Sequence, residues 1–590
     1  MIDNEARTKA KLIFDFVFIF IGLVAFVSFI LAVGFYLTPG QLDILNIISD
    51  VIVVLFIAQE ILRWFFVRNK SEFIFERWFE LLMVVLLLLH LFFPDGIYAI
   101  ASLFMPRVEL KHISLFYIAI ISIAIMFIFV IKSLRYNHLL SKIKLHPGAI
   151  FSLSFMIVIL LGALAFSLPR ATHPGHSIRF IDALFTSTSA VCVTGLSTFD
   201  IATNLTTLGK LILILLIQIG GLGVMTLTTF FAIVFAGGLS VKVRVMLKDM
   251  LSQESVVEVW RLLYRIFSLT ILIELIGAFI LYFSMGGNLF SFDKALFYEC
   301  GFHSVSAFCN AGFSLYSNGL MYQTVNANYA YLTTIMLLIV LGGLGFSTLV
   351  NFGVFFRFKS DKRPFNLKFT LMSKLIVYST IFLIVIGMLL FMLVENHDYS
   401  GGVNFFQRFF HSLFLSITAR TAGFNTVPTE LLSYPAVMIL IILMWIGASP
   451  GSTGGGIKNT TAAITVLTLF NLIIGKERVE LGNREIHPYS IHHAFLVVIA
   501  SLLILGAGST ILVWLEPDKN PIDLIFEATS AISTVGLTRN ITTNLGDGGK
   551  IVVTLLMYIG RIGVLTFFIS LYKAQREPNY KLPKEQIIVG

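Results

Sequence analysis

One short pattern occurs four times in the sequence, and it limits the possible folds more than any other feature. Each copy is a stretch of small, hydroxyl-bearing and apolar residues that ends in a glycine, with Leu or Phe directly after it. The glycines are Gly195, Gly312, Gly423 and Gly536, and successive ones lie 117, 111 and 113 residues apart. A pattern that returns at a nearly fixed spacing indicates an internal repeat. The chain is therefore expected to contain four copies of one structural unit.

The surroundings of these repeats are strongly apolar. The chain has 590 residues, of which 57% are hydrophobic and only 13% are charged. Many apolar runs reach the roughly 20 residues that an α-helix needs to cross the hydrocarbon of a bilayer. The sequence thus predicts an all-α polytopic membrane protein. The first apolar run, at residues 12–37, is long and lacks a small-residue cleavage site, so we expect it to be retained as a span.

Each repeat follows the order helix, half-helix, glycine loop, helix. Four such repeats around one axis predict one central pore, with extra transmembrane helices at the N-terminus. An accessory N-terminal four-helix transmembrane region is expected at residues 1–147. Pore repeats one to three are expected at residues 148–250, 251–360 and 361–475, and pore repeat four with the C-terminal tail at residues 476–590. The accessory helices are expected near residues 12–37, 48–67, 78–93 and 113–133.

The glycine loops are the candidate ion site. Glycine adopts backbone angles that other residues resist, so each half-helix can turn back and leave carbonyl oxygens unpaired. Unpaired carbonyls persist at membrane depth only beside a water-filled or ion-filled path. A ring of them can replace the water shell of a cation; four ordinary tight turns are the simpler alternative. The expected filter residues are Val193, Thr194, Gly195, Asn310, Ala311, Gly312, Thr421, Ala422, Gly423, Thr534, Val535 and Gly536.

The second helix of repeat three is interrupted. Residues 447–458 include five glycines and one proline, a composition that cannot continue a helix. An irregular segment at this depth must face a cavity, so we expect either a gate below the filter or a passive break. The expected gate residues in this segment are Gly447, Ser449, Pro450, Gly451, Ser452, Thr453, Gly454, Gly455, Gly456 and Lys458.

Repeat four carries a charge in its second helix. Arg561 stands where the other repeats have Gly221, Gly343 and Ala448. A charge deep in a span is costly and normally faces a pore or a partner. Two interpretations are open, and both can hold together: a positive barrier to cations that belongs to the gate, or a structural arginine bonded to backbone carbonyls.

Charge placement predicts the orientation of the chain. The net charge is +9, and Lys and Arg gather in the short connections at 132–147, 238–261, 356–374, 475–487 and 572–590. The positive-inside rule places these segments, and both termini, in the cytoplasm. The basic residues are thus explained by the lipid bilayer, and no nucleic-acid partner is expected. Three cysteines, Cys192, Cys300 and Cys309, do not form a disulfide framework.

Taken together, these motifs resemble the Trk/Ktr/HKT superfamily of potassium transporters and channels. The resemblance covers about residues 148–573 and depends on the four glycine loops, the 447–458 interruption and Arg561. It implies a potassium-selective pore in one chain, homodimerisation, and gating by the interruption and Arg561. It also implies a partner, a cytosolic ring subunit that binds nucleotides, and a bacterial cell (inner) membrane. The four N-terminal helices depart from the family pattern.

The expected function is channel-like potassium uptake driven by the membrane potential. The transported ion is K⁺, with Na⁺ as a second candidate and no covalent cofactor. The alternative is a potassium symporter coupled to Na⁺ or H⁺, with an occluded site at mid-membrane. An enzyme is not expected, because no His-Glu-x-x-His motif occurs and His492-His493 has no nearby acidic third ligand.

Overall fold

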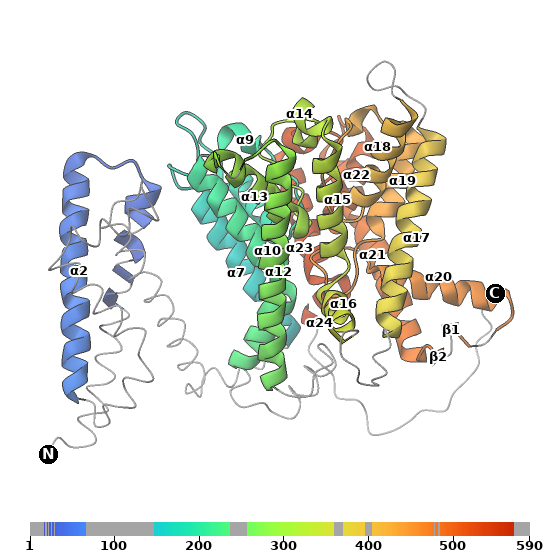
Figure 1. The fold of residues 1–590 in the computed structure, drawn as a ribbon, viewed down its shortest axis with the longest axis horizontal. Helices are drawn as coiled ribbons and strands as arrows, with labels where there is room; N and C mark the ends of the chain where they lie inside the picture. The colour runs from blue at the N-terminus through green and yellow to red at the C-terminus, as the bar shows by residue number, and fades with distance from the viewer. Residues whose placement is uncertain are drawn as a thin grey trace. The chain divides into compact units, whose positions relative to one another are not determined.

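The structure is almost entirely helical. It is a computed structural model, which describes residues 31–66, 147–235, 256–288, 290–358, 370–395, 404–476, 478–481 and 484–571, with some positions between 17 and 30. The chain divides into two compact units. The smaller unit consists of Met1–Ile143 and Leu168–Ser177, and the larger unit consists of Lys144–Ser167 and Ile178–Gly590. Figure 1 shows α2 in the smaller unit and the helices of the larger unit, and the expected all-α class is confirmed.

The smaller unit contains one long described helix, α2 (Pro39–Phe66). The sequence predicted a helix from about residue 48, but α2 begins nine residues earlier at Pro39, since proline fits the first turn of a helix. The described residues between 17 and 34 are helical, as expected for the first span. The helices expected at 78–93 and 113–133 lie outside the described residues.

The larger unit contains the expected repeats in order. The helices of repeat one are α7 (Pro147–Phe166), the half-helix α8 (Phe180–Val191) and α10 (Thr207–Phe235). The helices of repeat two are α12 (Val256–Ser284), the half-helix α13 (Lys294–Phe308), α15 (Tyr329–Gly343) and α16 (Phe346–Phe358). Short helices α9 (Ile201–Asn204) and α14 (Gln323–Asn326) lie in the connections after the glycine loops.

Repeats three and four follow the same plan. The helices of repeat three are α17 (Leu371–Val394), the half-helix α18 (Phe405–Thr418), α19 (Tyr434–Trp445) and α20 (Asn459–Ile473). The helices of repeat four are α21 (Pro488–Leu515), the half-helix α22 (Pro521–Ile532), α23 (Asp547–Ile562) and α24 (Val564–Leu571). A hairpin of β1 (Glu480–Leu481) and β2 (Arg484–Glu485) connects the two repeats.

The half-helices are short, and side chains cap the start of α13 and α22. They have 12 to 15 residues, which gives a length of about 18–23 Å at 1.5 Å per residue, less than the roughly 30 Å of hydrocarbon. Asp293 caps α13 and Asn520 caps α22 by accepting backbone N–H bonds. The caps fix the starts of α13 and α22, and all four half-helices end at a glycine loop inside the unit.

Three of the four second helices are broken, although the sequence predicted a break only in repeat three. In repeat two, α15 and α16 meet at an angle of 103°, and Gly345 between them has a φ of 86°. In repeat four, Gly563 separates α23 from α24 with a φ of 93°. Helix α10 of repeat one continues through Gly223. A glycine at this position permits the turn, but it does not impose one.

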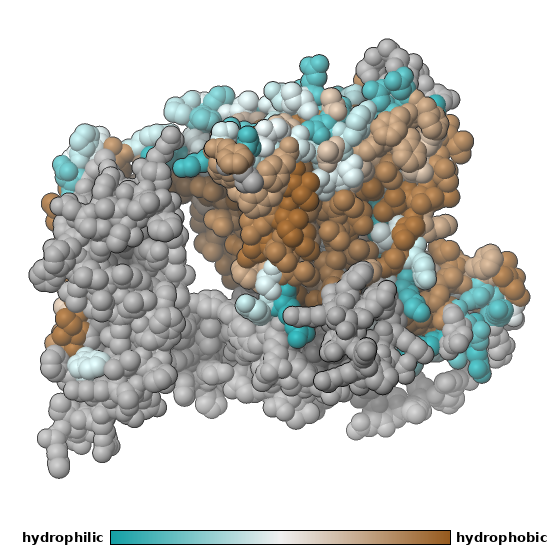
Figure 2. Space-filling view, viewed as in Figure 1, coloured by the Kyte–Doolittle hydropathy of each residue, from teal (hydrophilic) through white to brown (hydrophobic). Residues whose placement is uncertain are grey.

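The surface of the larger unit suits a bilayer. Among the described residues, four helices are long and apolar enough to cross a membrane, and the bent pair α15–α16 adds a fifth candidate. Figure 2 shows a wide apolar area across the middle of the visible face, with hydrophilic residues along its upper edge. Large apolar side chains such as Leu337 and Leu503 are exposed on these helices. The chain is a polytopic membrane protein.

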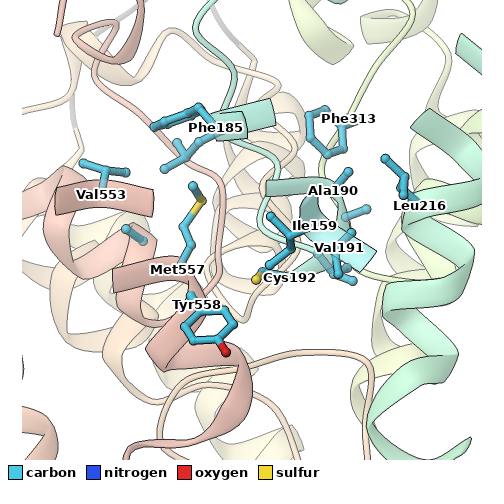
Figure 3. Packing of buried hydrophobic residues seen from close by; sticks show 14 of the residues in the cluster. Ile159, Phe185, Ala190, Val191, Cys192, Leu216, Phe313, Val553, Met557 and Tyr558 are labelled. Atoms are coloured by element: carbon cyan, nitrogen blue, oxygen red, sulfur yellow. The ribbon is translucent and has the colours of Figure 1, made fainter. Parts of the chain in front are cut away.

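The largest buried cluster joins three of the repeats. Figure 3 shows Phe185 of α8, Leu216 of α10 and Met557 of α23 in this cluster, together with Phe313 from the loop of repeat two. Phe185 and Met557 are fully buried. This packing fixes the half-helix of repeat one against helices of repeats one and four, and it thereby sets the position of the first glycine loop.

Candidate functional site

The four glycine loops form a closed ring. The space where a Cβ atom would stand on each glycine is filled by a backbone carbonyl of another repeat. A Cβ would lie 2.5 Å from Ala311 O at Gly195, 2.7 Å from Ala422 O at Gly312, 2.4 Å from Val535 O at Gly423 and 2.0 Å from Thr194 O at Gly536. Each loop therefore meets the next one in chain order, and the fourth meets the first. The structure brings all four predicted loops together.

The backbone of every loop is strained in the same way. The four glycines have φ angles of 98°, 71°, 76° and 94°. The residue two positions before each glycine is also left-handed although it carries a side chain: Val193, Asn310, Thr421 and Thr534, with φ between 49° and 69°. Only five non-glycine residues in the described part of the chain have positive φ. Such angles cost about 1–3 kcal/mol each and persist where the surroundings impose them, often at functional sites.

Hydroxyl groups of the half-helices brace the loops. The Oγ atoms of Ser189 and Ser530 accept the N–H of Gly195 and Gly536, both at 3.0 Å. In repeat two the bond has the opposite sense, since Ser306 Oγ donates to Phe313 O at 2.8 Å.

Repeat three has Ile417 in place of that serine, and the next residue supplies the brace. Thr418 Oγ1 donates to Phe424 O at 2.6 Å, and Phe424, like Phe313, directly follows its filter glycine. The repeat pattern did not point to Thr418, because Ser189, Ser306 and Ser530 share one position in the repeat and Thr418 lies one residue after it. A hydroxyl one residue later is the signal that could have identified it.

Each second helix contains a short glycine motif, at residues 219–223, 341–345, 446–451 and 559–563. The first glycine of each motif lets backbones approach closely. A Cβ would lie 2.2 Å from Val191 O at Gly220, and 1.9 Å from Phe308 O at Gly342. At Gly560 it would lie 1.9 Å from Ile532 O. These three glycines pack the second helices against the ends of the half-helices. In repeat three the partner is different, because a Cβ at Gly447 would meet Gly455 O at 2.2 Å, inside the interrupting loop itself.

The interrupting loop lies against the ring. It connects Trp445 at the end of α19 to Asn459 at the start of α20. The N–H of Gly455 donates to Thr534 Oγ1 at 3.0 Å, and Thr453 Oγ1 donates to Phe308 O at 3.4 Å. A Cβ at Gly454 would lie 2.1 Å from Thr421 Oγ1. The loop is thus in contact with the first filter residue of repeats three and four.

The loop is also anchored to repeat two. The N–H of Ser449 donates to Gly343 O at 3.1 Å, and the N–H of Phe346 donates to Gly451 O at 3.0 Å. A Cβ at Gly345 would lie 2.6 Å from Pro450 O. The break between α15 and α16 therefore lies where the second helix of repeat two meets this loop. Within the loop, Ser452 N donates to Ser449 O, and Gly456 is left-handed with a φ of 67°.

Arg561 joins three repeats at this level. It is in the last turn of α23 and is 4% exposed. Its guanidinium donates to the backbone carbonyls of Thr453, in the loop, and Gly220, in repeat one. Nearby, Lys458 Nζ donates to Gly454 O at 2.7 Å. These bonds of Arg561 to backbone carbonyls are the ones expected of a structural arginine. One of them is with the interrupting loop, the candidate gate.

Buried acidic residues also support the site, and the sequence analysis did not single them out. Glu527 of α22 accepts hydrogen bonds from Thr538 at 2.8 Å and Thr542 at 2.5 Å, which braces the segment after Gly536. Asp523 pairs with Arg539 at 2.9 Å. An acidic side chain in the second half of α22, where its neighbours are apolar or small, is the signal that could have revealed Glu527.

Metal ligands do not gather in the part of the chain that the structure describes, where no group of three His, Cys, Asp or Glu side chains lies close enough to hold an ion. Cys192, Cys300 and Cys309 are buried free thiols. The candidate site thus brings together the ring of glycine loops, the interrupting loop and the side chains of Lys458 and Arg561.

Comparison with known proteins agrees with this geometry. The family model described as "TrkH: Cation transport protein" matches residues 154–581. The chain is 34% identical to the Ktr system potassium uptake protein D of Bacillus subtilis, over 76% of this chain and 98% of that protein. It is 36% identical to the potassium/sodium uptake protein NtpJ of Enterococcus hirae, again over 76% and 98%. The fold matches the potassium transporter TrkH from Vibrio parahaemolyticus with a TM-score of 0.56 and 17% identity, over 83% of this chain and 95% of that one.

Proposed function

The chain belongs to the TrkH family of cation transport proteins, and on this basis we propose that it carries potassium into the cell through the ring of glycine loops. The observation that carries the proposal is the closure of the ring, in which each filter glycine touches a carbonyl of another repeat. Carbonyl oxygens arranged around one axis can take the place of the water around a dehydrated cation. The expected filter is the set of three residues that ends at each glycine.

The driving force is the membrane potential. One elementary charge gains about 2.3 kcal/mol for every 100 mV it crosses, so a negative cell interior can draw K⁺ inward without ATP. The half-helices end at the ring, where their partial negative charge favours a cation. Glycine at all four filter positions resembles the potassium-selective members of the family, and two relatives carry potassium uptake in their names.

The interrupting loop and Arg561 form the gate in this proposal. Two observations support it: Gly455 donates to Thr534 of the filter, and Arg561 bonds to Thr453 of the loop and to Gly220 across from it. The buried guanidinium also places positive charge below the ring, which opposes cation passage until the loop and the arginine move.

An ion-coupled potassium symporter is the second candidate. The observation that favours it is the contact of the interrupting loop with the ring, since a transporter with an occluded site also needs an inner barrier at broken helices. The two candidates differ in kinetics. Unitary currents are expected of the channel, whereas a fixed ratio of K⁺ to Na⁺ or H⁺ is expected of the symporter.

The assembly follows from the same premise. We propose a homodimer in the bacterial inner membrane, with both termini in the cytoplasm, that works with a cytosolic ring subunit able to bind nucleotides. The cationic connections on the cytoplasmic side support the orientation. The matched relatives are uptake proteins, which favours a transporter over an enzyme.

The test is ion flux into liposomes that contain the purified chain. Rubidium and potassium are expected to enter down an imposed negative potential, and sodium much more slowly. Gly195→Ser and Gly312→Ser should lower flux and reduce the preference for K⁺ over Na⁺. The matched control is Gly301→Ser in the half-helix α13, where an added Cβ meets open space. Unchanged flux and preference in both filter variants would refute the filter assignment.

A further inference from the structure

A cavity of about 250 Å³ lies behind the interrupting loop, between repeats three and four. Trp445 at the end of α19 and Lys458 at the end of the loop line one side. Val497 of α21 and Ser533 at the end of α22 line the other. The volume approaches the range of small-molecule sites, about 300–1,000 Å³. No step of the proposed ion path uses this space.

The polar groups that line the cavity can supply hydrogen bonds to a ligand. An ammonium and an indole can only donate, and a serine hydroxyl can donate as well. Lys458 has one bond, to Gly454 O, out of three that its ammonium can make. Trp445 Nε1 and Ser533 Oγ are shielded from solvent and have no hydrogen-bond partner, and Ser533 is 1% exposed. Buried donors of this kind call for an acceptor.

The charge around the cavity is positive. The ion pairs found among the described residues include neither Lys458 nor Arg561. Two cations thus lie at membrane depth without a carboxylate, where an opposite charge is normally expected. A cation would be repelled from this space, whereas an anion would be attracted to it.

Apart from the hydroxyls of Thr461, Ser501 and Thr566, the remaining wall of the cavity is apolar. Ile532, Ile562 and Val497 line it, together with the break between α23 and α24. A ligand that matches both parts must have oxygen acceptors with negative charge at one end and a hydrocarbon chain at the other. We propose that this cavity binds the head of an amphipathic anion, a fatty acid or an anionic phospholipid, with its oxygens accepting bonds from Lys458, Trp445 and Ser533.

The position of this site connects it to the gate. The ammonium of Lys458 is bonded to Gly454, and Gly454 lies against the filter residue Thr421. A bound anion would accept bonds from the two remaining donors of this ammonium and draw it toward the cavity, away from the Gly454 carbonyl. The ligand would thus weaken one of the contacts that hold the loop below the ring.

Quenching of tryptophan fluorescence tests the proposal without relying on transport. The full chain is reconstituted in phosphatidylcholine liposomes, and a fatty acid with bromine atoms on its chain is added. We expect a saturable quenching component that Trp445→Phe removes. The brominated methyl ester of the same acid, which lacks the negative charge, should not produce it. Equal quenching by the acid and its ester would overturn the recognition of an anion.

Variants of the cavity wall complete the test. Lys458→Met should weaken the saturable component at least tenfold, and Val497→Phe should abolish it by filling the space. The matched control is Leu496→Phe, the preceding residue of α21, which is 53% exposed and points away from the cavity. Brominated phosphatidylglycerol in a second arm distinguishes a lipid headgroup from a free carboxylate, and saturable quenching by either supports the site. Quenching that is not saturable, or that Val497→Phe leaves intact, would overturn the proposal.

Discussion

The ring of glycine loops and the helices directly below it differ in symmetry. The four loops have the same backbone, with a left-handed residue two positions before a left-handed glycine. The four second helices are not equivalent: α10 is continuous, α15–α16 and α23–α24 are broken at a glycine, and repeat three has a loop of irregular chain. A site that surrounds an ion needs four equal contributions, whereas a barrier needs only one repeat to depart from the others.

The largest effects on transport are expected from adding a side chain to a filter glycine, because this change disrupts the symmetric ring of glycine loops. Alanine at Gly536 would place its Cβ 2.0 Å from Thr194 O, and at Gly312 2.7 Å from Ala422 O. Potassium uptake should fall at least tenfold in Gly536→Ala and less in Gly312→Ala, as measured by rubidium flux. Gly301→Ala is the control. If Gly536→Ala transports normally, the ring does not conduct.

Shortening the interrupting loop should raise ion flux, whereas a side chain on a filter glycine should lower it. Deletion within residues 451–456 removes the contacts with Thr534 and Phe308, so we expect the flux of the purified chain to rise several-fold. Thermal unfolding of the variant shows whether it still folds. A folded deletion variant with wild-type flux would mean that the loop is a passive break.

Substitution of Arg561 separates its charge from its hydrogen bonds. Lysine keeps the charge but loses the planar fork that reaches two carbonyls, while methionine removes both. We expect flux to rise a few-fold in Arg561→Lys and further in Arg561→Met, since the bonds to Thr453 and Gly220 hold the loop. Wild-type flux in Arg561→Lys would show that only the charge matters.

The smallest effect is expected at the hydroxyl brace of repeat three. Thr418→Val removes the bond to Phe424 O and should cost about 1 kcal/mol of stability, seen as a lower midpoint of thermal unfolding. Thr333→Val is the control, because its hydroxyl bonds only to the preceding turn of an exposed helix face. Equal shifts in the two variants would mean that Thr418 does not brace the loop.

The sequence predicted local features well where the cause is local. The glycine loops, the half-helices and the interruption at residues 447–458 follow from residue types and spacing, and the structure has all of them. The bends at Gly345 and Gly563 were not predicted. Gly223 has the same place in its motif and stays helical, so the motif alone does not decide. At Gly345 the bend coincides with a bond between Phe346 and Gly451 of the loop, a contact that spacing cannot show.

Anomalous X-ray diffraction from rubidium-soaked crystals tests most directly the central claim, that the ring of glycine loops binds the transported ion. Crystals of the protein soaked in rubidium, whose anomalous scattering identifies it, should show the ion on the axis of the ring, among the carbonyl oxygens of Thr194, Ala311, Ala422 and Val535. Sodium-soaked crystals should show weaker density at that point. An axis without rubidium, in protein that still transports rubidium in liposomes, would contradict the account.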